Sequence, residues 1–108
     1  MGQVTVLVIH SSAALREQIK FVLGGGEYRI MQAVDFGQGL GFLRFRPVDL
    51  LICETEVPNF VSVPTILLRE CRKGDSKLQR VYLPRPFSSD GLNVAVRRAL
   101  GDMVSPFT

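Results

Sequence analysis

The sequence lacks the features that mark membrane-spanning and secreted proteins. No apolar run approaches the ~20 residues that cross a bilayer. The N-terminus, MGQVTVLVIH, has neither the basic start nor the small-residue cleavage site of a secretory signal. Only two cysteines are present, Cys53 and Cys71, each in an apolar or helix-like context where a free thiol serves as a small hydrophobe. We therefore expect a cytoplasmic protein without disulfides and without a membrane partner.

The net charge is small, but its positive excess is concentrated in one stretch. Of the 108 residues, 46% are hydrophobic and 21% are charged, which fits one compact domain, 1–101, followed by a tail, 102–108. Cations outnumber acids between residues 69 and 85, where we define the basic surface as Arg69, Arg72, Lys73, Arg80 and Tyr82. This surface is a candidate site for an acidic partner. The simpler interpretation is a helix end whose cations stay solvated.

Hydrophobic patterning predicts alternating strands and helices. The run at 4–9 is apolar or β-branched throughout, as in a strand that is covered on both faces. Ser12, Asp35 and either Ser88 or Ser89 stand where they can cap helices. The expected set is strands at 4–9, 28–34, 49–54 and 80–83, and helices at 12–23, 36–46 and 88–100. This alternation predicts an open parallel sheet with helices on both faces.

Residues 62–73 admit two interpretations. The apolar run at 63–68 is compatible with a strand, whereas Ser62 can cap a helix that continues through residue 73. We favour the helix, because apolar residues recur at helical spacing, cations occupy its last turn and Gly74 follows directly.

Four segments, in this order, resemble the receiver domain of bacterial two-component response regulators. They are VLVIHSSAALR at 6–16, VDLLICE at 48–54, LLRECRKGDSKL at 67–78 and LPRPF at 83–87. The resemblance covers residues 4–100. It implies an α/β fold, the flavodoxin-like doubly wound parallel sheet, and a role as a signalling module that is not an enzyme.

The same resemblance implies a site that this sequence has altered. In the family, an acidic pair after the first strand binds magnesium, an aspartate ending the third strand accepts phosphate, and a lysine before a proline, usually in a cis peptide, contacts the phosphoryl group. Here the acidic pair falls on His10 and Ser11, the aspartate on Glu54 and the lysine on Arg85. We define the degenerate pocket as His10, Ser11, Glu54, Thr55, Arg85 and Pro86.

These replacements remove the chemistry that the family needs. A neutral His10 and Ser11 cannot hold a hard cation that prefers oxygen ligands, and phosphoryl transfer needs the charge of that metal. His10 and Glu54 alone are also too few ligands for another metal site. Cys53 should face the helix layer, away from any base, and pack in the core. We expect no metal, no cofactor and no phosphorylation.

The chain is also shorter than the receiver domains that it resembles. Between Glu54 and Arg85 it lacks about one strand-plus-helix unit, so we expect the fourth and fifth strands to be merged into one. The predicted sheet then has about four strands, in the order 2-1-3-4.

Glu54 and Arg85 should both point into the crevice at the carboxyl ends of the strands, where this topology places its sites. We therefore predict a direct ion pair between them. The pair would imitate the contact between a phosphorylated acceptor and its lysine. The simpler interpretation is a solvated pair at the rim, which contributes ~0–1 kcal/mol.

The favoured function is a phosphorylation-independent pseudo-receiver that binds another signalling or regulatory protein. A second copy of the chain is an alternative partner, because a shortened sheet exposes an edge strand. Two other classes remain open. One is a phosphorylatable receiver with an atypical acceptor. The other is a binder of nucleic acid or acidic partners through the basic surface, although nucleic-acid recognition patterns are missing.

Overall fold

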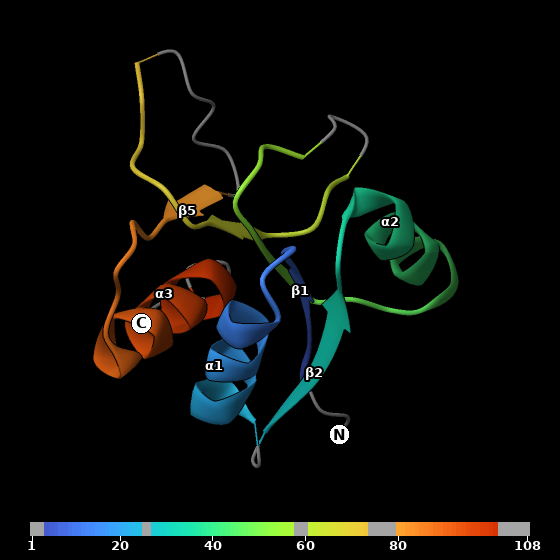
Figure 1. The fold of residues 1–108 in the computed structure, drawn as a ribbon, viewed down its shortest axis with the longest axis horizontal. Coiled ribbons are helices and arrows are strands. Elements are labelled where there is room, and N and C mark those ends of the chain that lie inside the picture. Colours follow the sequence, from blue (N-terminus) through green and yellow to red (C-terminus); the bar gives the residue numbers. More distant parts are fainter. Residues whose placement is uncertain (1–3, 25–26, 58–60, 74–79, 102–108) are drawn as a thin grey trace.

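Alternating strands and helices build one parallel sheet (Figure 1). The computed structural model describes residues 4–24, 27–57, 61–73 and 80–101, so the expected tail at 102–108 lies outside it. The elements, in chain order, are β1 (Val4–Ile9), α1 (Ala13–Leu23), β2 (Tyr28–Ala33), α2 (Phe36–Phe45), β3 (Leu50–Cys53), β4 (Thr65–Leu67), β5 (Arg80–Tyr82) and α3 (Ser89–Gly101). None of the described helices is long and apolar enough to span a membrane.

The sheet is five-stranded, with the order β2-β1-β3-β4-β5 and parallel pairing throughout. Val6 of β1 lies opposite Ile30 of β2 on one side and Leu50 of β3 on the other. The strand order reverses at β1, as in other doubly wound folds. The predicted fold class is therefore confirmed.

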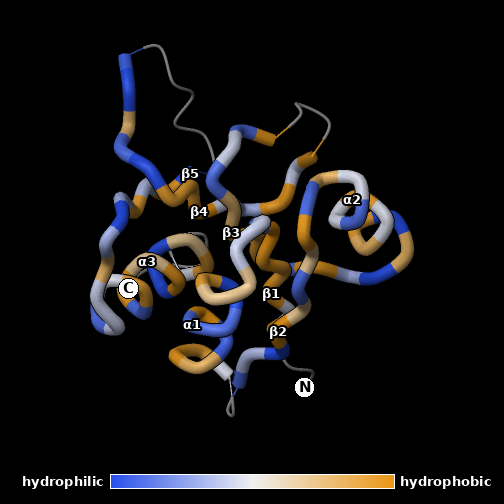
Figure 2. The backbone as a smooth tube through the Cα atoms, viewed as in Figure 1, coloured by the Kyte–Doolittle hydropathy of each residue, from blue (hydrophilic) through white to orange (hydrophobic). Residues whose placement is uncertain are grey.

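Successive residues of the central strands face opposite helix layers. Val6, Val8, Leu50 and Ile52 belong to the apolar cluster that includes residues of α1 and α3. The residues between them join a second cluster, with α2 packed against it. Figure 2 shows these strands as a hydrophobic centre, and Figure 1 shows α1 and α3 together on one side with α2 apart from them. This period of two is what a strand buried on both faces requires.

The predicted caps begin the helices. The Ser12 side chain accepts a hydrogen bond from the Leu15 backbone N–H, and Asp35 accepts one from Gln38. Of the two candidate serines, Ser88 is the cap, because its hydroxyl oxygen accepts the backbone N–H of Gly91, whereas Ser89 is the first residue of α3. Each contact satisfies a backbone donor that has no partner within its own helix.

The helix predicted over 62–73 is wrong. Thr65–Leu67 is the strand β4, fully buried and paired with β3 on one side and β5 on the other. Burial on both faces explains the error, since a short run that is apolar throughout fits a core strand as well as a helix. The cations that suggested a helix end follow the strand, and Gly74 is outside the described residues.

The predicted merging of the fourth and fifth strands is also wrong, because the sheet keeps both and has five strands rather than four. The shortening falls on the connections instead. In the described parts of the crossovers on either side of β4, residues 54–57, 61–64 and 68–73, no helix is present. On the α2 side, the described connections therefore place no helix over β4 and β5.

Candidate functional site

His10 lies directly beyond β1 and is fixed by its backbone before its side chain is considered. Its N–H donates to the Ala33 carbonyl at 3.0 Å, which extends the pairing of β1 with β2 by one residue. Arg16 of α1 donates from Nη1 to the His10 carbonyl at 2.6 Å and from Nε to the Gln32 side chain at 3.1 Å. Arg16 is thus a positioning residue that the sequence analysis missed.

The hydrogen bonds of the His10 ring assign its tautomer. The Ser12 backbone N–H donates to Nδ1 at 2.9 Å, so Nδ1 must offer its lone pair. In the neutral ring the hydrogen is then on Nε2, which lies 2.6 Å from Oε1 of Glu54 and donates to it. His10 consequently presents no nitrogen lone pair toward Glu54.

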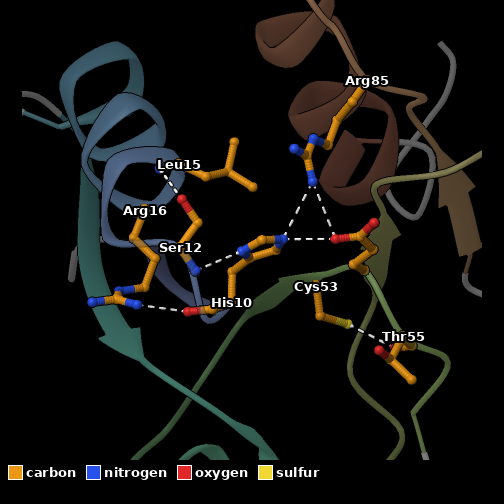
Figure 3. A network of polar contacts seen from close by, with 8 residues as sticks. His10, Ser12, Leu15, Arg16, Cys53, Thr55 and Arg85 are labelled. Carbon is orange, nitrogen blue, oxygen red and sulfur yellow. Dashed lines mark hydrogen bonds and ion pairs between the residues drawn. The ribbon is translucent and has the colours of Figure 1, made fainter.

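The predicted ion pair between Glu54 and Arg85 is present. Nη1 of Arg85 lies 3.2 Å from the same Oε1 that His10 contacts. The distance from Arg85 Nη1 to His10 Nε2 is 3.4 Å, and both atoms carry hydrogens, so they are neighbours because they share an acceptor. Figure 3 shows the Arg85 and His10 side chains converging from two directions. Glu54 and Arg85 are each nearly half exposed.

The other members of the degenerate pocket surround this centre. Ser11 and Thr55 line, with His10 and Glu54, a cavity of about 270 Å³ on the α2 side. Pro86 follows Arg85 through a cis peptide, as the resemblance implies. It lines a larger hollow of about 710 Å³, which also borders Glu54 and Arg85. The structure thus brings all six predicted residues to one end of the sheet.

These residues do not fit the magnesium ion that the fold family implies. A hard cation needs several oxygen ligands, and Glu54 is the carboxylate at this centre. Its Oε1 is already bonded to two donors. Asp35 borders the smaller cavity, but its Oδ1 caps α2. Among the described residues, no group of three or more histidine, cysteine or acidic side chains could hold a metal ion.

Cys53 is a core residue, as predicted. It is 1% exposed in the cluster on the α2 side, and its thiol donates to the Thr55 carbonyl at 3.3 Å. Burial raises the pKa of this thiol to about 12. At neutral pH it stays protonated and is unsuited to act as a nucleophile.

The basic surface is divided by a carboxylate that the sequence analysis did not single out. Glu56 Oε2 accepts hydrogen bonds from Nε and Nη2 of Arg80 at 2.9 and 2.7 Å, and its Oε1 lies 3.7 Å from Nη2 of Arg69. The Arg69 guanidinium lies over the Tyr82 ring, 5.5 Å from its centroid. The residues in these contacts come from β5 and from the connections on either side of β4, whose described parts contain no helix.

This arrangement changes the interpretation of the basic surface. Arg69 and Arg80 are mostly buried and already contact an acid, whereas Arg72 and Lys73 are exposed after β4. The cations of the basic surface therefore do not form one uniform set that could bind the phosphate backbone of a nucleic acid. A useful signal in the sequence was the spacing of Glu54 and Glu56, which places a second carboxylate beyond the same strand.

Structural comparison shows that the fold is similar to that of receiver domains in solved structures. The chemotaxis protein CheY4 of Vibrio cholerae is similar, with a TM-score of 0.75, 18% identity and coverage of 92% of this chain and 100% of that one. A signal receiver domain of an HD domain-containing protein from Pseudomonas fluorescens gives a TM-score of 0.72 at 25% identity, covering 91% and 94% of the two chains. The non-phosphorylated HemR receiver domain of Leptospira biflexa gives 0.71 at 16% identity, covering 98% and 100%.

Sequence comparison finds no match to a protein-family model or to a curated protein. The resemblance to receiver domains is thus carried by the fold. The fold is that of response-regulator receiver domains.

Proposed function

We propose that this receiver domain works without phosphorylation and presents one fixed surface to another signalling or regulatory protein. The observation that carries the proposal is Oε1 of Glu54, which accepts hydrogen bonds from both Arg85 and His10. Two donors on one oxygen withdraw negative charge from the carboxylate and so weaken it as a nucleophile toward phosphorus. Among the described residues, no group of acidic side chains gathers here to seat the metal that the reaction needs.

The same geometry supports a permanent signalling state. A guanidinium and an imidazole N–H around one carboxylate oxygen reproduce the kind of contact that the resemblance assigns to a phosphorylated acceptor and its lysine. Glutamate has one more methylene than aspartate, so its carboxylate extends further toward Arg85. In this proposal, Glu54 supplies the negative charge that phosphorylation supplies elsewhere.

Incubation with magnesium and acetyl phosphate should leave the intact mass of the protein unchanged. The physical reason is that the transfer needs a metal ion to neutralise charge on the transferred group, and Arg85 and the His10 N–H are already engaged with Oε1 of Glu54. Intact-mass spectrometry checks this, with a receiver domain that is known to be phosphorylated as the positive control. A mass gain of one phosphoryl group that disappears in Glu54→Gln would overturn the proposal and support the atypical acceptor.

The contact between Glu54 and Arg85 should be detectable as coupling in a double-mutant cycle. Because both side chains are nearly half exposed, we expect a coupling free energy of only about 0.5–1 kcal/mol for Glu54→Ala and Arg85→Ala. Chemical denaturation of the wild type, both single variants and the double variant measures it.

The matched control for this cycle pairs Glu54→Ala with Arg29→Ala, an exposed arginine in β2. These two changes should add within about 0.3–0.5 kcal/mol, because the residues share no partner. The prediction fails if the coupling free energy between Glu54→Ala and Arg85→Ala is no larger than that of the control pair. The ion pair would then be a solvated contact at the rim that does not hold the pocket together.

A further inference from the structure

The α2 helix is apolar nearly all the way round. Of its 10 residues, only Gln38 and Arg44 have polar side chains, whereas α1 and α3 each carry several charged residues. The inner side of α2 packs on the sheet, where Gly39 is buried. On the outer side, Leu40 is only partly buried and Phe45 is 81% exposed. A helix that is apolar on every side is normally covered on more than one of them.

An apolar groove lies along α2, between the helix and the chain that leads into β4. Its volume is about 230 Å³, and its walls are Leu40, Leu43 and Arg44 on one side and residues 61–63 on the other. Connections between parallel strands usually contain a helix that covers the sheet. The described part of this connection next to β4, residues 61–64, contains none. In the described part of the chain the groove is therefore open to aliphatic side chains of another molecule.

The charges around this groove are of one sign. Arg44 lines it, and Arg46 is exposed two residues further along the chain. Arg29 is exposed in β2 and, by the alternation of the strand, points toward the helix layer of α2. Within the described ranges, none of these three arginines makes an ion pair. Asp49, which follows α2, already accepts the Thr5 backbone N–H at 2.8 Å. The complementary partner is thus acidic.

The shape of this surface favours a peptide over a nucleic acid or a membrane. Phe45 lies beside Arg44, whose guanidinium is 6.0 Å from the centroid of the ring. A nucleic-acid base would stack on Phe45 but would leave the apolar groove empty. A concave groove also fits a bilayer surface poorly. An amphipathic helix, in contrast, offers aliphatic side chains every three or four residues with acids between them, which matches an apolar groove flanked by cations.

We propose that an acidic amphipathic helix of a partner protein docks on the outer side of α2, with aliphatic side chains in the groove between Leu40 and Val63 and carboxylates at Arg44 and Arg46. The inference specifies a partner surface for the function proposed above, and it rests on that function for the partner being a protein. No residue that lines the groove belongs to the degenerate pocket. The intact-mass experiment therefore tests the absence of phosphorylation separately, and either result can fail without the other.

The probe is a fluorescent synthetic peptide of about 16 residues, long enough to form a helix, with leucine at every third or fourth position and glutamate or alanine elsewhere. Fluorescence anisotropy should give a Kd of about 100 μM or lower with the wild type. The same peptide with lysine in place of every glutamate should bind at least about tenfold more weakly. NMR chemical-shift changes caused by the acidic peptide should gather on α2 and on residues 61–63.

Reversal of the charges tests the electrostatic part of the proposal. The double variant Arg44→Glu with Arg46→Glu should weaken binding of the glutamate peptide by about tenfold or more and should bind the lysine peptide instead. The matched control is Arg97→Glu with Arg98→Glu, which makes the same change of net charge at two exposed arginines of α3. This control should keep the preference of the wild type for the glutamate peptide. Circular dichroism checks that both double variants are folded.

Replacement of Leu40 tests the apolar part. Leu40→Gln keeps the size and charge of the side chain but makes the groove wall polar, so it should weaken the glutamate peptide by about fivefold or more. Val94→Thr, a similar exchange at a half-exposed position of α3, is the control and should leave the Kd unchanged.

Three results would overturn the proposal. The first is a wild type that does not bind the glutamate peptide at up to about 1 mM. The second is a control pair on α3 that weakens the peptide as strongly as the pair on α2. The third is tighter binding, dependent on Arg44, to vesicles of phosphatidylserine and phosphatidylcholine or to a thymidine oligonucleotide than to the peptide, because the surface would then serve a membrane or a nucleic acid.

Discussion

Replacing Leu92 with alanine should lower the free energy of unfolding by about 3 kcal/mol, within the ~2–5 kcal/mol that such a truncation costs in a packed core. Leu92 is fully buried, in the cluster that joins α3 to Ile19 of α1 and Ile66 of β4. The truncation removes apolar contacts with the elements on both sides and leaves a cavity. Urea denaturation followed by circular dichroism measures the loss.

Val94→Ala is the matched control for this prediction, because it truncates an aliphatic side chain two residues further along the same helix. Val94 is half exposed, so the free energy of unfolding should change by less than about 0.5 kcal/mol. Equal losses in the two variants would contradict the way α3 is packed on the sheet.

Gly39→Val should destabilise the protein by about 2–3 kcal/mol, although glycine is itself a poor helix residue. The reason is the close approach of α2 to β1. A Cβ atom at residue 39 would overlap the end of the Ile9 side chain, which is buried in the cluster on the α2 side. The backbone fixes the position of Cβ, so no rotamer avoids this contact, and either α2 or the Ile9 side chain must move.

The same substitution at Gly41 provides the comparison. A Cβ atom there meets nothing within 4 Å, so Gly41→Val should leave the free energy of unfolding unchanged or raise it by a few tenths of a kcal/mol through helix propensity. Thermal and urea unfolding of the two variants measure the difference. A Gly39→Val protein as stable as the Gly41→Val protein would contradict the packing of α2 against β1.

The sequence predicted the elements whose residues leave little choice. The apolar and β-branched run of β1 is typical of a strand covered on both faces of a parallel sheet, and Ser12 stands where α1 needs a cap. The segment around Ile66 failed, because its burial depends on β3 and β5 lying on either side of it. Periodicity within one segment carries no information about such neighbours.

The contact between Glu54 and Arg85 in the pocket could also be predicted from the sequence. Glu54 follows β3 and Arg85 follows β5, so both lie at the same end of the parallel sheet, where the topology predicts that they can meet across β4. The part played by His10 could not be predicted, because it depends on the Ser12 backbone N–H meeting Nδ1 and thereby fixing the hydrogen on Nε2. Likewise, the contact of Glu56 with Arg80 depends on how the crossover before β4 bends back over the sheet.

An imidazole ring has a fixed width, and the ring of His10 is engaged at both nitrogens. One nitrogen contacts the backbone at the start of α1, and the other contacts the carboxylate beyond β3. A protein that docks near the pocket and draws the Glu54 side chain toward itself would therefore break the bond to His10 or displace the ring, and the Nδ1 contact links such a displacement to the backbone at the start of α1. The rigid ring therefore couples the position of the Glu54 carboxylate, beyond β3, to the start of α1, although the two are more than 40 residues apart in the sequence.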